Sequence, residues 1–516
     1  MLNPATTSLL LSTTAAATAA AADMGVDLNW HAPAASALNN LTSALQASGT
    51  YGFIFNTSRT PDDRYGSYNW CNMPHVRRTE YVVPPQEEGY ELQYVEVIQR
   101  HHKRTPYAAN AFPVEPYHWD CDDQGLFYFG QSVLANDDNS KKSAQTYWKG
   151  ITNSTINPFV PSGWIGSCQF PQITTGGLDD SRTHGEDLYG VYHTLLNFLP
   201  SRDAEDGQAW RRHVVYRVTN NQITSQVAGQ VIAGMWGAAA LARPVPLLIQ
   251  AAGVDSLEPQ YPCPAGSAAF KRLQSSADAR WQGHLDAARP LYATLDAISG
   301  VPADDAGFHA SFDHYYDNLS ARQCHGGKPL PCNPQNSKDC VDQDLADTVY
   351  RLGQWEYSHL YRDAGPAALR ASAAAYGVWV AELAAHLRAV AAGAGGDVRY
   401  LHNVAHDGSL SRVLAILQID TMVWPGMGSE VVFELYQQKK NKKTTTPTTP
   451  RSSEDKSADA AHFVRVLFGG KPLKSSNPSL GLMDMLPLET LLAYFDGLVG
   501  ENASLIKGKC DGSIPL

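Results

Sequence analysis

The order of secondary-structure signals constrains the fold of this chain more than any other feature of its sequence. Residues 92–99 alternate apolar and polar side chains and are rich in Val, Ile and Tyr, which predicts a β-strand. Apolar residues recur at helical spacing in 182–199 and 221–242, and strand-like segments stand at 213–218 and 397–405. Strands that alternate with helices in this way predict an α/β core with helices on a sheet.

The middle of the chain has a different character. Residues 245–395 lack a convincing strand signal and contain Ala-rich helical stretches such as 368–393. We therefore predict a mainly helical cap inserted into a core that residues 50–244 and 396–510 form. A chain of 516 residues is long enough for both parts, since one domain uses about 100–200 residues.

The last part of the chain contains two further strand signals around a polar segment. Residues 429–437 and 462–468 alternate apolar and polar side chains and predict antiparallel partners. Residues 439–459 between them are rich in Lys, Thr, Ser and Pro and are low in complexity. Such a segment cannot bury a core, so we predict a disordered hairpin loop there.

Net charge argues against nucleic acid as a partner. The chain contains 51 acidic against 40 basic residues, a formal net charge of -11, and no basic stripe runs along it. Hydrophobic residues make up 43% and charged residues 18%, as in a globular protein with a large core. The local run "RHHKR" at 100–104 is an exception that calls for a reason.

Several features favour the secretory pathway. Residues 1–22 have an apolar centre followed by small residues and resemble a signal peptide without a positive first part; an Ala-rich tail is the alternative. Eight cysteines, none in a CxxC pair, predict disulfides rather than zinc. No segment has 18 uninterrupted apolar residues, so we expect no membrane span. We predict a secreted or vacuolar glycoprotein, with glycosylation sequons at Asn40, Asn56, Asn153, Asn318 and Asn502.

Unusual polar residues follow three of the predicted strands. The first strand runs into Arg100, His101 and Arg104, the second ends near Arg217, and the third ends at His406-Asp407. In an open α/β sheet, ligands bind at the carboxyl ends of the strands. If these strands are neighbours, the side chains at their ends converge on one pocket.

Such a set of side chains has a chemical meaning. The guanidinium group of arginine presents a planar fork of donors that matches phosphate oxygens, and a dianion between three arginines would offset their mutual repulsion. A neutral imidazole among cations has a depressed pKa and is able to attack phosphorus. A carboxylic acid on the far side is able to protonate the departing alkoxide. This scheme requires no metal and no cofactor.

Plainer interpretations exist for several of these residues. The run at 100–104 alone would be read as a solvated basic turn. His402 and His406 are four residues apart and suggest a metal pair, but a strand does not stack them as a helix would. His184 stands in "RTHGED" at a predicted helix start, which we interpret as a surface histidine.

Several blocks of the sequence resemble the histidine acid phosphatases. "RHHKRTP" resembles the RHGxRxP signature of that family, and "AHD" resembles its second, His-Asp signature. "CQFPQITTGGLDDSRTHGEDLYGVYHTLL", "VVYRVTNNQITSQVAGQVIAGMW" and "WPGMGSEVVFELYQ" resemble other blocks of the family, in the same order. The resemblance runs from about residue 90 to about residue 500 and depends on the ordered set rather than on any single motif.

The resemblance implies a phosphoglycerate-mutase-like fold, a mixed α/β sheet flanked by helices, with a helical cap before the His-Asp motif. It implies that His101 is the nucleophile, which becomes a phosphohistidine, and that Asp407 is the general acid. It also implies that phosphate is bound by Arg100, Arg104, Arg217 and His406.

Two departures from the family pattern stand out. His102 occupies the position of the family's glycine after the nucleophile, where glycine usually marks a special conformation or a close approach. It is a possible modulator that either crowds the site or points away. Ile223 stands where the family usually carries another arginine. Lys103 falls on a variable position, and we predict that it is solvated.

The predicted function is that of a secreted acid phosphatase, a phosphoric monoester hydrolase acting on a small phosphomonoester. The alternative is a family member with weakened catalysis that binds phosphorylated or sulfated ligands. A mutase on the same fold is a weaker third option. The sequence selects no physiological substrate and no oligomeric state.

Overall fold

The structure is a computed structural model of the chain. It describes residues 25–52, 68–114, 117–127, 143–151, 156–160, 164–203, 208–241, 243–326, 328–439 and 461–516. The predicted signal peptide and the sequons at Asn56 and Asn153 lie outside these ranges. So does the predicted loop 439–459, apart from Lys439.

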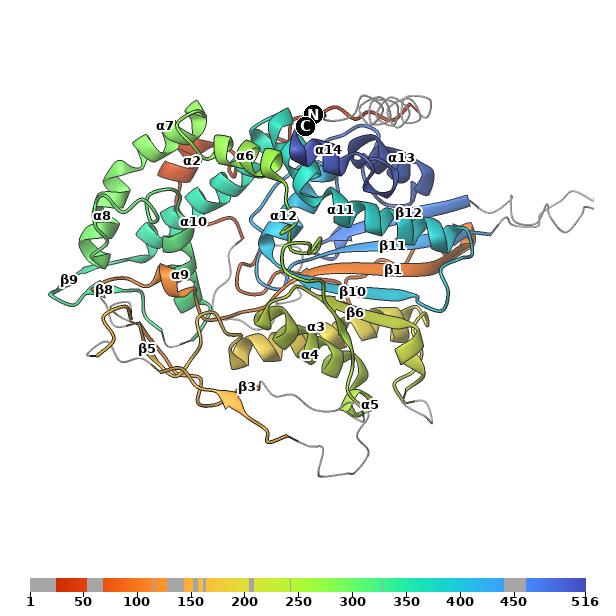
Figure 1. Cartoon of the computed structure of the whole chain (residues 1–516), viewed down its shortest axis with the longest axis horizontal. Coiled ribbons are helices and arrows are strands. Elements are labelled where there is room, and N and C mark those ends of the chain that lie inside the picture. The colour runs from red at the N-terminus through yellow and green to blue at the C-terminus, as the bar shows by residue number, and fades with distance from the viewer. Residues whose placement is uncertain are drawn as a thin grey trace, which may run out of the picture.

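A mixed β-sheet lies at the centre of the fold (Figure 1). Its order is β13-β12-β11-β1-β10-β6-β7; β14 pairs with β12. The strands β1, β10, β6 and β7 are parallel, whereas β11 is antiparallel to β1 and to β12. The prediction of an α/β fold with a mixed sheet flanked by helices is confirmed. The strands are β1 (Tyr90–Arg100), β6 (Val214–Val218), β7 (Leu247–Leu248), β10 (Tyr400–Ala405), β11 (Glu430–Gln438), β12 (Ala461–Phe468), β13 (Lys471–Pro472) and β14 (Leu486–Pro487).

The register of the parallel strands decides which side chains meet at the carboxyl edge. Arg100 at the end of β1 pairs with Ala405 at the end of β10. Arg217 of β6 pairs with Asn403, which pairs in turn with Ile98 of β1. Arg217 is therefore two residues short of the row that contains Arg100, a distance of about 7 Å along a strand.

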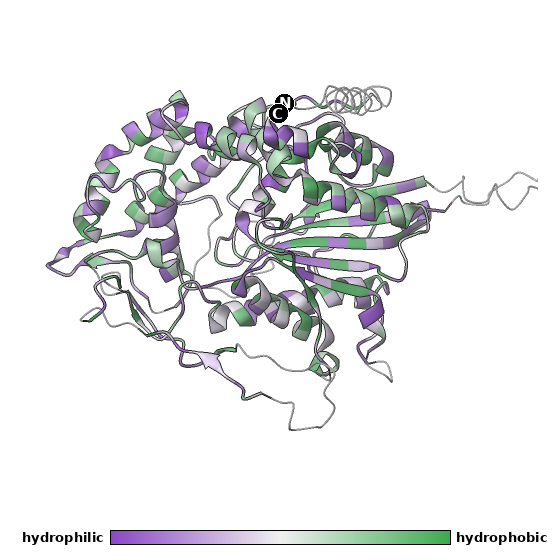
Figure 2. Ribbon diagram, viewed as in Figure 1, coloured by the Kyte–Doolittle hydropathy of each residue, from purple (hydrophilic) through white to green (hydrophobic). Residues whose placement is uncertain are grey.

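Helices cover both faces of the sheet. On one face α3 (Thr175–Tyr189) and α4 (Gln222–Trp236) pack their apolar side chains against inward-facing valines such as Val97. The other face is covered by α11 (Pro366–Ala391), α12 (Asp407–Ile416) and α13 (Leu488–Val499). Figure 2 shows hydrophobic residues along the strands between these two layers, as expected for a sheet that is buried on both faces.

The boundary of the helical middle differs from the sequence-based prediction. α11 falls inside the predicted cap, residues 245–395, yet it lies against β1 and α12 (Figure 1). α11 is a helix like those before it, so helical periodicity in the sequence gives no sign of the change. Small alanine side chains let α11 approach the sheet closely. The helices before it are α6 (Pro264–Leu273), α7 (Ala279–Ala287), α8 (Arg289–Ser299), α9 (Asp313–Gln323) and α10 (Gln343–Ser358).

Smaller elements complete the described chain. A π-helical turn, η5 (Gly190–Leu195), extends α3, and α5 (Ala238–Leu241) follows α4. Two short hairpin strands, β8 (Cys332–Asn333) and β9 (Asn336–Cys340), lie in the middle region, where no strand was predicted. The remaining helices and strands are α2 (Leu41–Gln46), α14 (Ile506–Asp511), β2 (Tyr117–Trp119), β3 (Leu126–Phe127), β4 (Tyr147–Trp148) and β5 (Trp164–Gly166). The 3-10 turns are η2 (Gln86–Glu88), η3 (Ala108–Asn110), η6 (Ala209–Arg212) and η9 (Glu501–Ala503), and η7 (His359–Asp363) is a second π-helical turn.

All eight cysteines form disulfides. Cys332 and Cys340 close the β8–β9 hairpin, whereas Cys324 is joined to Cys71. The other two bonds are Cys121–Cys168 and Cys263–Cys510. Four disulfides are compatible with a secreted protein. Among the described residues, none of the helices is long and apolar enough to cross a membrane.

Candidate active site

The carboxyl ends of β1 and β10 bring Arg100, His101, His406 and Asp407 together. The Arg100 guanidinium group lies 3.1 Å from the Asp407 carboxylate and donates a 2.5 Å hydrogen bond to the carbonyl oxygen of Pro425. Its central carbon lies 4.6 Å from the centre of the Trp70 ring, a cation–π contact. Arg100 is thus held rigidly, and it links the strand end to the His-Asp motif.

His101 is held as a neutral imidazole with one nitrogen directed by the backbone. Its Nδ1 lies 2.9 Å from the carbonyl oxygen of His102, which accepts only if Nδ1 carries the proton. Burial lowers the pKa of His101 well below its ordinary value, and the charges of Arg100 and Arg104 lower it further. Its Nε2 makes no hydrogen bond to any described residue. This nitrogen therefore carries a free lone pair, as a nucleophile requires.

His406 lies beside His101, with the two ring centres 5.5 Å apart. Its Nε2 is 2.9 Å from the hydroxyl oxygen of Thr219, which follows β6, and 3.9 Å from a carboxylate oxygen of Glu258. Burial lowers the pKa of His406 to about 4, and Arg100 and Arg104 act in the same direction against Asp407. The residue caps the N-terminus of α12, so the first amide groups of that helix point toward the same region.

Asp407 begins α12 and is surrounded by donors. Its carboxylate accepts hydrogen bonds from the Trp424 indole at 2.8 Å, the Gly408 amide at 2.8 Å and the Tyr357 hydroxyl at 3.3 Å. Tyr357 and Trp424 stack with their ring centres 4.0 Å apart. Burial alone would raise the pKa of Asp407, but Arg100 and Trp424 lower it overall.

Arg104 also belongs to this group, but its charge is already matched. Its guanidinium group lies 3.0 Å from the carboxylate of Asp317 on α9 and 4.3 Å from the centre of the Tyr107 ring. Asp317 in turn accepts from Asn110 at 2.7 Å. A carboxylate of the chain itself therefore offsets the charge of Arg104, in addition to any dianion that the sequence predicts.

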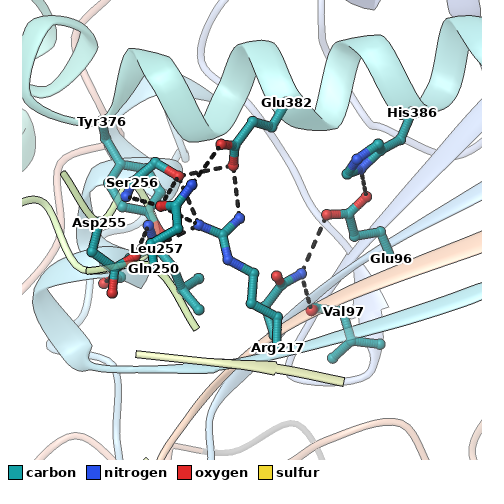
Figure 3. Close-up of polar contacts among 12 residues, drawn as sticks. Glu96, Val97, Arg217, Gln250, Asp255, Ser256, Leu257, Tyr376, Glu382 and His386 are labelled. Carbon is teal, nitrogen blue, oxygen red and sulfur yellow. Dashed lines mark hydrogen bonds and ion pairs between the residues drawn. The ribbon is translucent and has the colours of Figure 1, made fainter. Parts of the chain in front are cut away.

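Among the described residues, Arg217 contacts side chains outside this group, and its role in binding phosphate stays a prediction. Figure 3 shows its guanidinium group on the α11 side of the sheet, between Glu382, Gln250 and Ser256. The Glu382 contact is 2.7 Å and the other two are 2.8 Å. The register explains the difference, because Arg217 is two residues short of the carboxyl edge. Ile223, at the other departure from the family pattern, is buried in the core.

His102 points away from these residues. Its Nε2 lies 3.2 Å from Nδ1 of His184 on α3, and its ring lies over Gly428. Gly428 has a φ of +71°, and a Cβ atom there would lie 2.3 Å from Cε1 of His102. Gly428, just before β11, thus leaves space for the ring of His102, which stands where the family pattern has a glycine. His102 therefore does not crowd His101.

His102 belongs to a set of buried polar side chains, which we call the buried histidine cluster: His75, His102, His184, His402 and Glu430. His184 lies 2.9 Å from Glu430, stacks on His75 at 3.9 Å between ring centres, and is fully buried. The prediction of a surface histidine at position 184 is therefore wrong. Gln99 connects His402 to His184, with contacts of 2.7 and 3.2 Å.

Two further expectations for charged or glycosylated positions are corrected. Lys103 is buried and lies 3.0 Å from Asp180, so it is not solvated. Asn318 is 0% exposed, and its side-chain amide donates to the Asn110 carbonyl and accepts from Arg322. A glycan has no room there. Of the described sequons, those at Asn40 and Asn502 are exposed.

The site has no arrangement suited to a metal. Within the described ranges, no group of three or more His, Cys, Asp or Glu side chains is placed to hold an ion. His402 contacts Tyr400 and Gln99, whereas His406 contacts Thr219, so the two histidines face different partners.

Three residues of the site were not predicted from the sequence: Asp317, Thr219 and Trp424, which contact Arg104, His406 and Asp407 in that order. Asp317 lies 213 residues after Arg104, and no local pattern marks it. Trp424 lies within the quoted block "WPGMGSEVVFELYQ", and Thr219 within the block around Arg217. The signal that could have identified Thr219 and Trp424 is a polar or aromatic residue close to the end of a predicted strand.

Comparisons place the chain beside known phosphatase structures. It is similar to the Hafnia alvei phytase (12% identity, 82% of this chain and 99% of that one, TM-score 0.48). It is also similar to the Klebsiella sp ASR1 phytase (14%, 80% and 96%, 0.43) and to the Bifidobacterium longum multiple inositol polyphosphate phosphatase (13%, 84% and 93%, 0.38). No protein-family model matches the chain, and no curated protein matches it significantly. At these identities and TM-scores the likenesses assign no activity to this chain.

Proposed function

We propose that the protein hydrolyses phosphomonoesters through a phosphohistidine on His101. The observation that carries the proposal is the hydrogen bond from His101 Nδ1 to the carbonyl oxygen of His102, in a site with two arginines. That bond fixes the tautomer and leaves the lone pair of Nε2 available. Burial lowers the pKa of His101 well below its ordinary value, and the positive charges around it lower it further, which favours the neutral imidazole.

In the first step, Nε2 of His101 forms a bond to phosphorus while the ester P–O bond breaks. Arg100 and Arg104 stabilise charge on the phosphoryl oxygens, together with a hydrogen bond from His406 and the N-terminal amides of α12. Asp407, in its protonated form, gives its proton to the departing alkoxide oxygen. The products are an alcohol and a phosphorylated His101.

In the second step, water attacks phosphorus and the P–N bond breaks. Asp407, now a carboxylate, takes the proton from water, so that inorganic phosphate and the original enzyme are restored. The lowered pKa of Asp407 without ligand results from Arg100 and Trp424, against the effect of burial. A phosphate dianion on Arg100 competes for that charge, so substrate binding raises the pKa of Asp407 toward the value that an acid needs.

The phosphate-binding set in this proposal is Arg100, Arg104 and His406, without Arg217. Both arginines have carboxylate partners, Asp407 and Asp317. An incoming phosphate adds charge-assisted hydrogen bonds to donors that are already oriented, so little reorganisation is needed.

Hydrolysis of p-nitrophenyl phosphate between pH 3 and pH 8 tests the proposal, with the wild type and His101→Ala. We expect activity with an acidic optimum in the wild type and a loss of at least about 10³-fold in the variant. Glu501→Gln, an exposed position on η9, is a matched control that keeps full activity. Equal rates in the wild type and His101→Ala would overturn the proposal.

A binding function without turnover is the second candidate. The original reason for it, crowding by His102, falls away because that ring contacts His184. What favours it is the lowered pKa of Asp407, because a carboxylate without its proton cannot act as the general acid. Tight binding of inorganic phosphate by a chain that leaves p-nitrophenyl phosphate intact would support this candidate.

We also propose that the protein follows the secretory pathway. Four disulfides and exposed sequons at Asn40 and Asn502 support this route. Expression of the full chain in a eukaryotic host tests it. We expect protein in the medium that loses mass on glycosidase treatment, and less mass loss in Asn40→Gln and Asn502→Gln.

A further inference from the structure

Carboxylates dominate the charges around the proposed phosphate site. Each cation at or near it has an acidic partner: Arg100 has Asp407, Lys103 has Asp180, Arg104 has Asp317 and Arg217 has Glu382. Glu258 lies 3.9 Å from His406, and Asp255 is a second carboxylate beside Arg217, at 3.6 Å. Burial raises the pKa of Glu258, and the charge of Asp255 raises it further. Among these named groups, six carboxyl groups therefore face four cations.

A pocket of about 640 Å³ adjoins the same group. Thr219 is one of its lining residues, and the hydroxyl of Thr219 contacts His406 at 2.9 Å. Charged side chains are absent from its described lining. Instead the lining contains carboxamides and two partly exposed aromatic rings, Phe127 and Trp148. The carboxamides are Gln124, Asn220, Asn221, Gln222, Gln226 and Gln230.

Several of these polar groups are available to a ligand. Asn220, Ser225 and Gln230 make no side-chain hydrogen bond to a described residue, whereas Gln222 and Gln226 are partly used by the backbone of Pro171 and Ile173. Carboxamides donate and accept at once, which suits hydroxyl groups, and an aromatic ring covers the apolar face of a sugar-like ring. The lining thus matches a neutral, hydroxyl-rich group.

We propose that the substrate carries a single phosphate on a neutral, hydroxyl-rich leaving group, such as a sugar or polyol, which occupies this pocket. The inference rests on the proposed phosphatase function. Polyphosphorylated substrates are disfavoured, because a second phosphate would lie near Glu258 or among uncharged amides. Like charges a few ångströms apart at a partly buried site weaken binding by about tenfold or more.

Matched substrates test the charge preference. The wild-type enzyme is assayed with p-nitrophenyl phosphate, fructose 6-phosphate, fructose 1,6-bisphosphate, myo-inositol 1-phosphate and myo-inositol hexakisphosphate. We expect kcat/KM to be at least about tenfold higher for each monophosphate than for its polyphosphorylated partner. An equal or higher value for the polyphosphorylated member overturns the inference. No turnover of p-nitrophenyl phosphate is a different result, because it overturns the proposed function itself.

Glu258→Gln separates the charge effect from the shape of the site. The variant keeps the size of the side chain, so we expect the monophosphate preference to shrink by about threefold to tenfold, mainly through a lower KM for the bisphosphate. Glu501→Gln serves as the control and should leave the ratio unchanged. An unchanged ratio in Glu258→Gln would remove Glu258 from the explanation.

Trp148→Ala and Gln230→Ala test whether the pocket holds the leaving group. We expect a KM for fructose 6-phosphate at least threefold higher, with a smaller change for ethyl phosphate, whose leaving group does not reach the pocket. Leu248→Ala is a control, since Leu248 is exposed nearby but does not line the pocket. Equal changes for both substrates would overturn the assignment of the pocket.

Discussion

Two consecutive histidines at the end of β1 face opposite environments. His101 has Arg100, Arg104 and His406 as neighbours, whereas His102 turns into the buried histidine cluster and contacts His184. Both are neutral because burial lowers their pKa, yet cations assist at His101 and other histidines assist at His102. The same residue type thus serves as a candidate nucleophile in one position and as an anchor in the next.

The backbone of His102 connects the environment of His101 to the buried histidine cluster. Its carbonyl oxygen accepts the His101 proton, while its ring is fixed by His184, which Glu430 orients at 2.9 Å. Glu430 next to Nε2 of His184 leaves Nδ1 as an acceptor, which His102 and the side-chain amide of Gln99 share, each at 3.2 Å. Anchoring the His102 ring therefore also holds the carbonyl group that sets the tautomer of His101.

The largest expected effect concerns the environment of His101, where Asp407 is the proposed proton donor. Asp407→Asn removes the proton donor but keeps the shape of the side chain. We expect a loss of about 10²–10⁴-fold in kcat with alkyl phosphates, which have poor leaving groups, and a much smaller loss with p-nitrophenyl phosphate. Steady-state kinetics with both substrates measure this, and equal losses would contradict the acid role.

The buried histidine cluster should instead appear in the pH dependence of stability. Burial lowers the pKa of His402 to about 4 from an ordinary value of 6.5. Between these values the imidazole binds a proton in the unfolded chain but not in the folded chain. The free energy of unfolding therefore falls as pH falls from 6.5 to 4, by up to roughly 3 kcal/mol. Unfolding of the wild type relative to His402→Gln isolates this contribution. A difference that is independent of pH would contradict the account.

His102→Gly restores the glycine of the family pattern and tests whether the side chain of His102 stabilises the protein or restrains catalysis. The ring fills space against Gly428 and satisfies His184, so its removal should cost about 2 kcal/mol of stability and give no gain in kcat. His102→Gln, which keeps a polar group, should lose less. Denaturant unfolding and assays on the same samples decide it, and a large gain in kcat would show that His102 restrains the wild type.

The smallest expected effect distinguishes two arginines. Arg104→Ala removes a charged donor at the site and should weaken inhibition by inorganic phosphate about tenfold. Arg217→Ala disrupts contacts with Glu382 and Ser256 and should lower stability while the inhibition constant stays within about twofold. If Arg217→Ala weakened phosphate inhibition as much as Arg104→Ala, the exclusion of Arg217 would be wrong.

The strands and helices of the core were predictable because each carries a clear hydrophobic period. Position at a strand end was enough to identify Arg100 and Asp407, which the fold joins at 3.1 Å. Arg217 also stands near a strand end, and the predicted strand 213–218 ends where β6 ends. The sequence does not contain the register of β6 against β10, which sets Arg217 two residues, about 7 Å, short of the row of Arg100.

Other parts of the site depend on contacts that no local pattern contains. His184 stands in a polar stretch, and only the packing of α3 against β1 and β11 buries it beside Glu430. The partnership of His102 with Gly428 joins residues 326 positions apart through one close approach. The sequence does not reveal such pairs of residues, because they come into contact only in the folded sheet.

The central claim is that His101 transfers the phosphoryl group through its own Nε2. Rapid mixing with ³²P-labelled phosphomonoester, followed by an alkaline quench that preserves phosphohistidine, tests this directly. We expect label on His101, identified by peptide mapping, with higher occupancy in Asp407→Asn assayed with p-nitrophenyl phosphate and none in His101→Ala. Turnover in the wild type without labelled His101, or with label on another residue, would contradict the account.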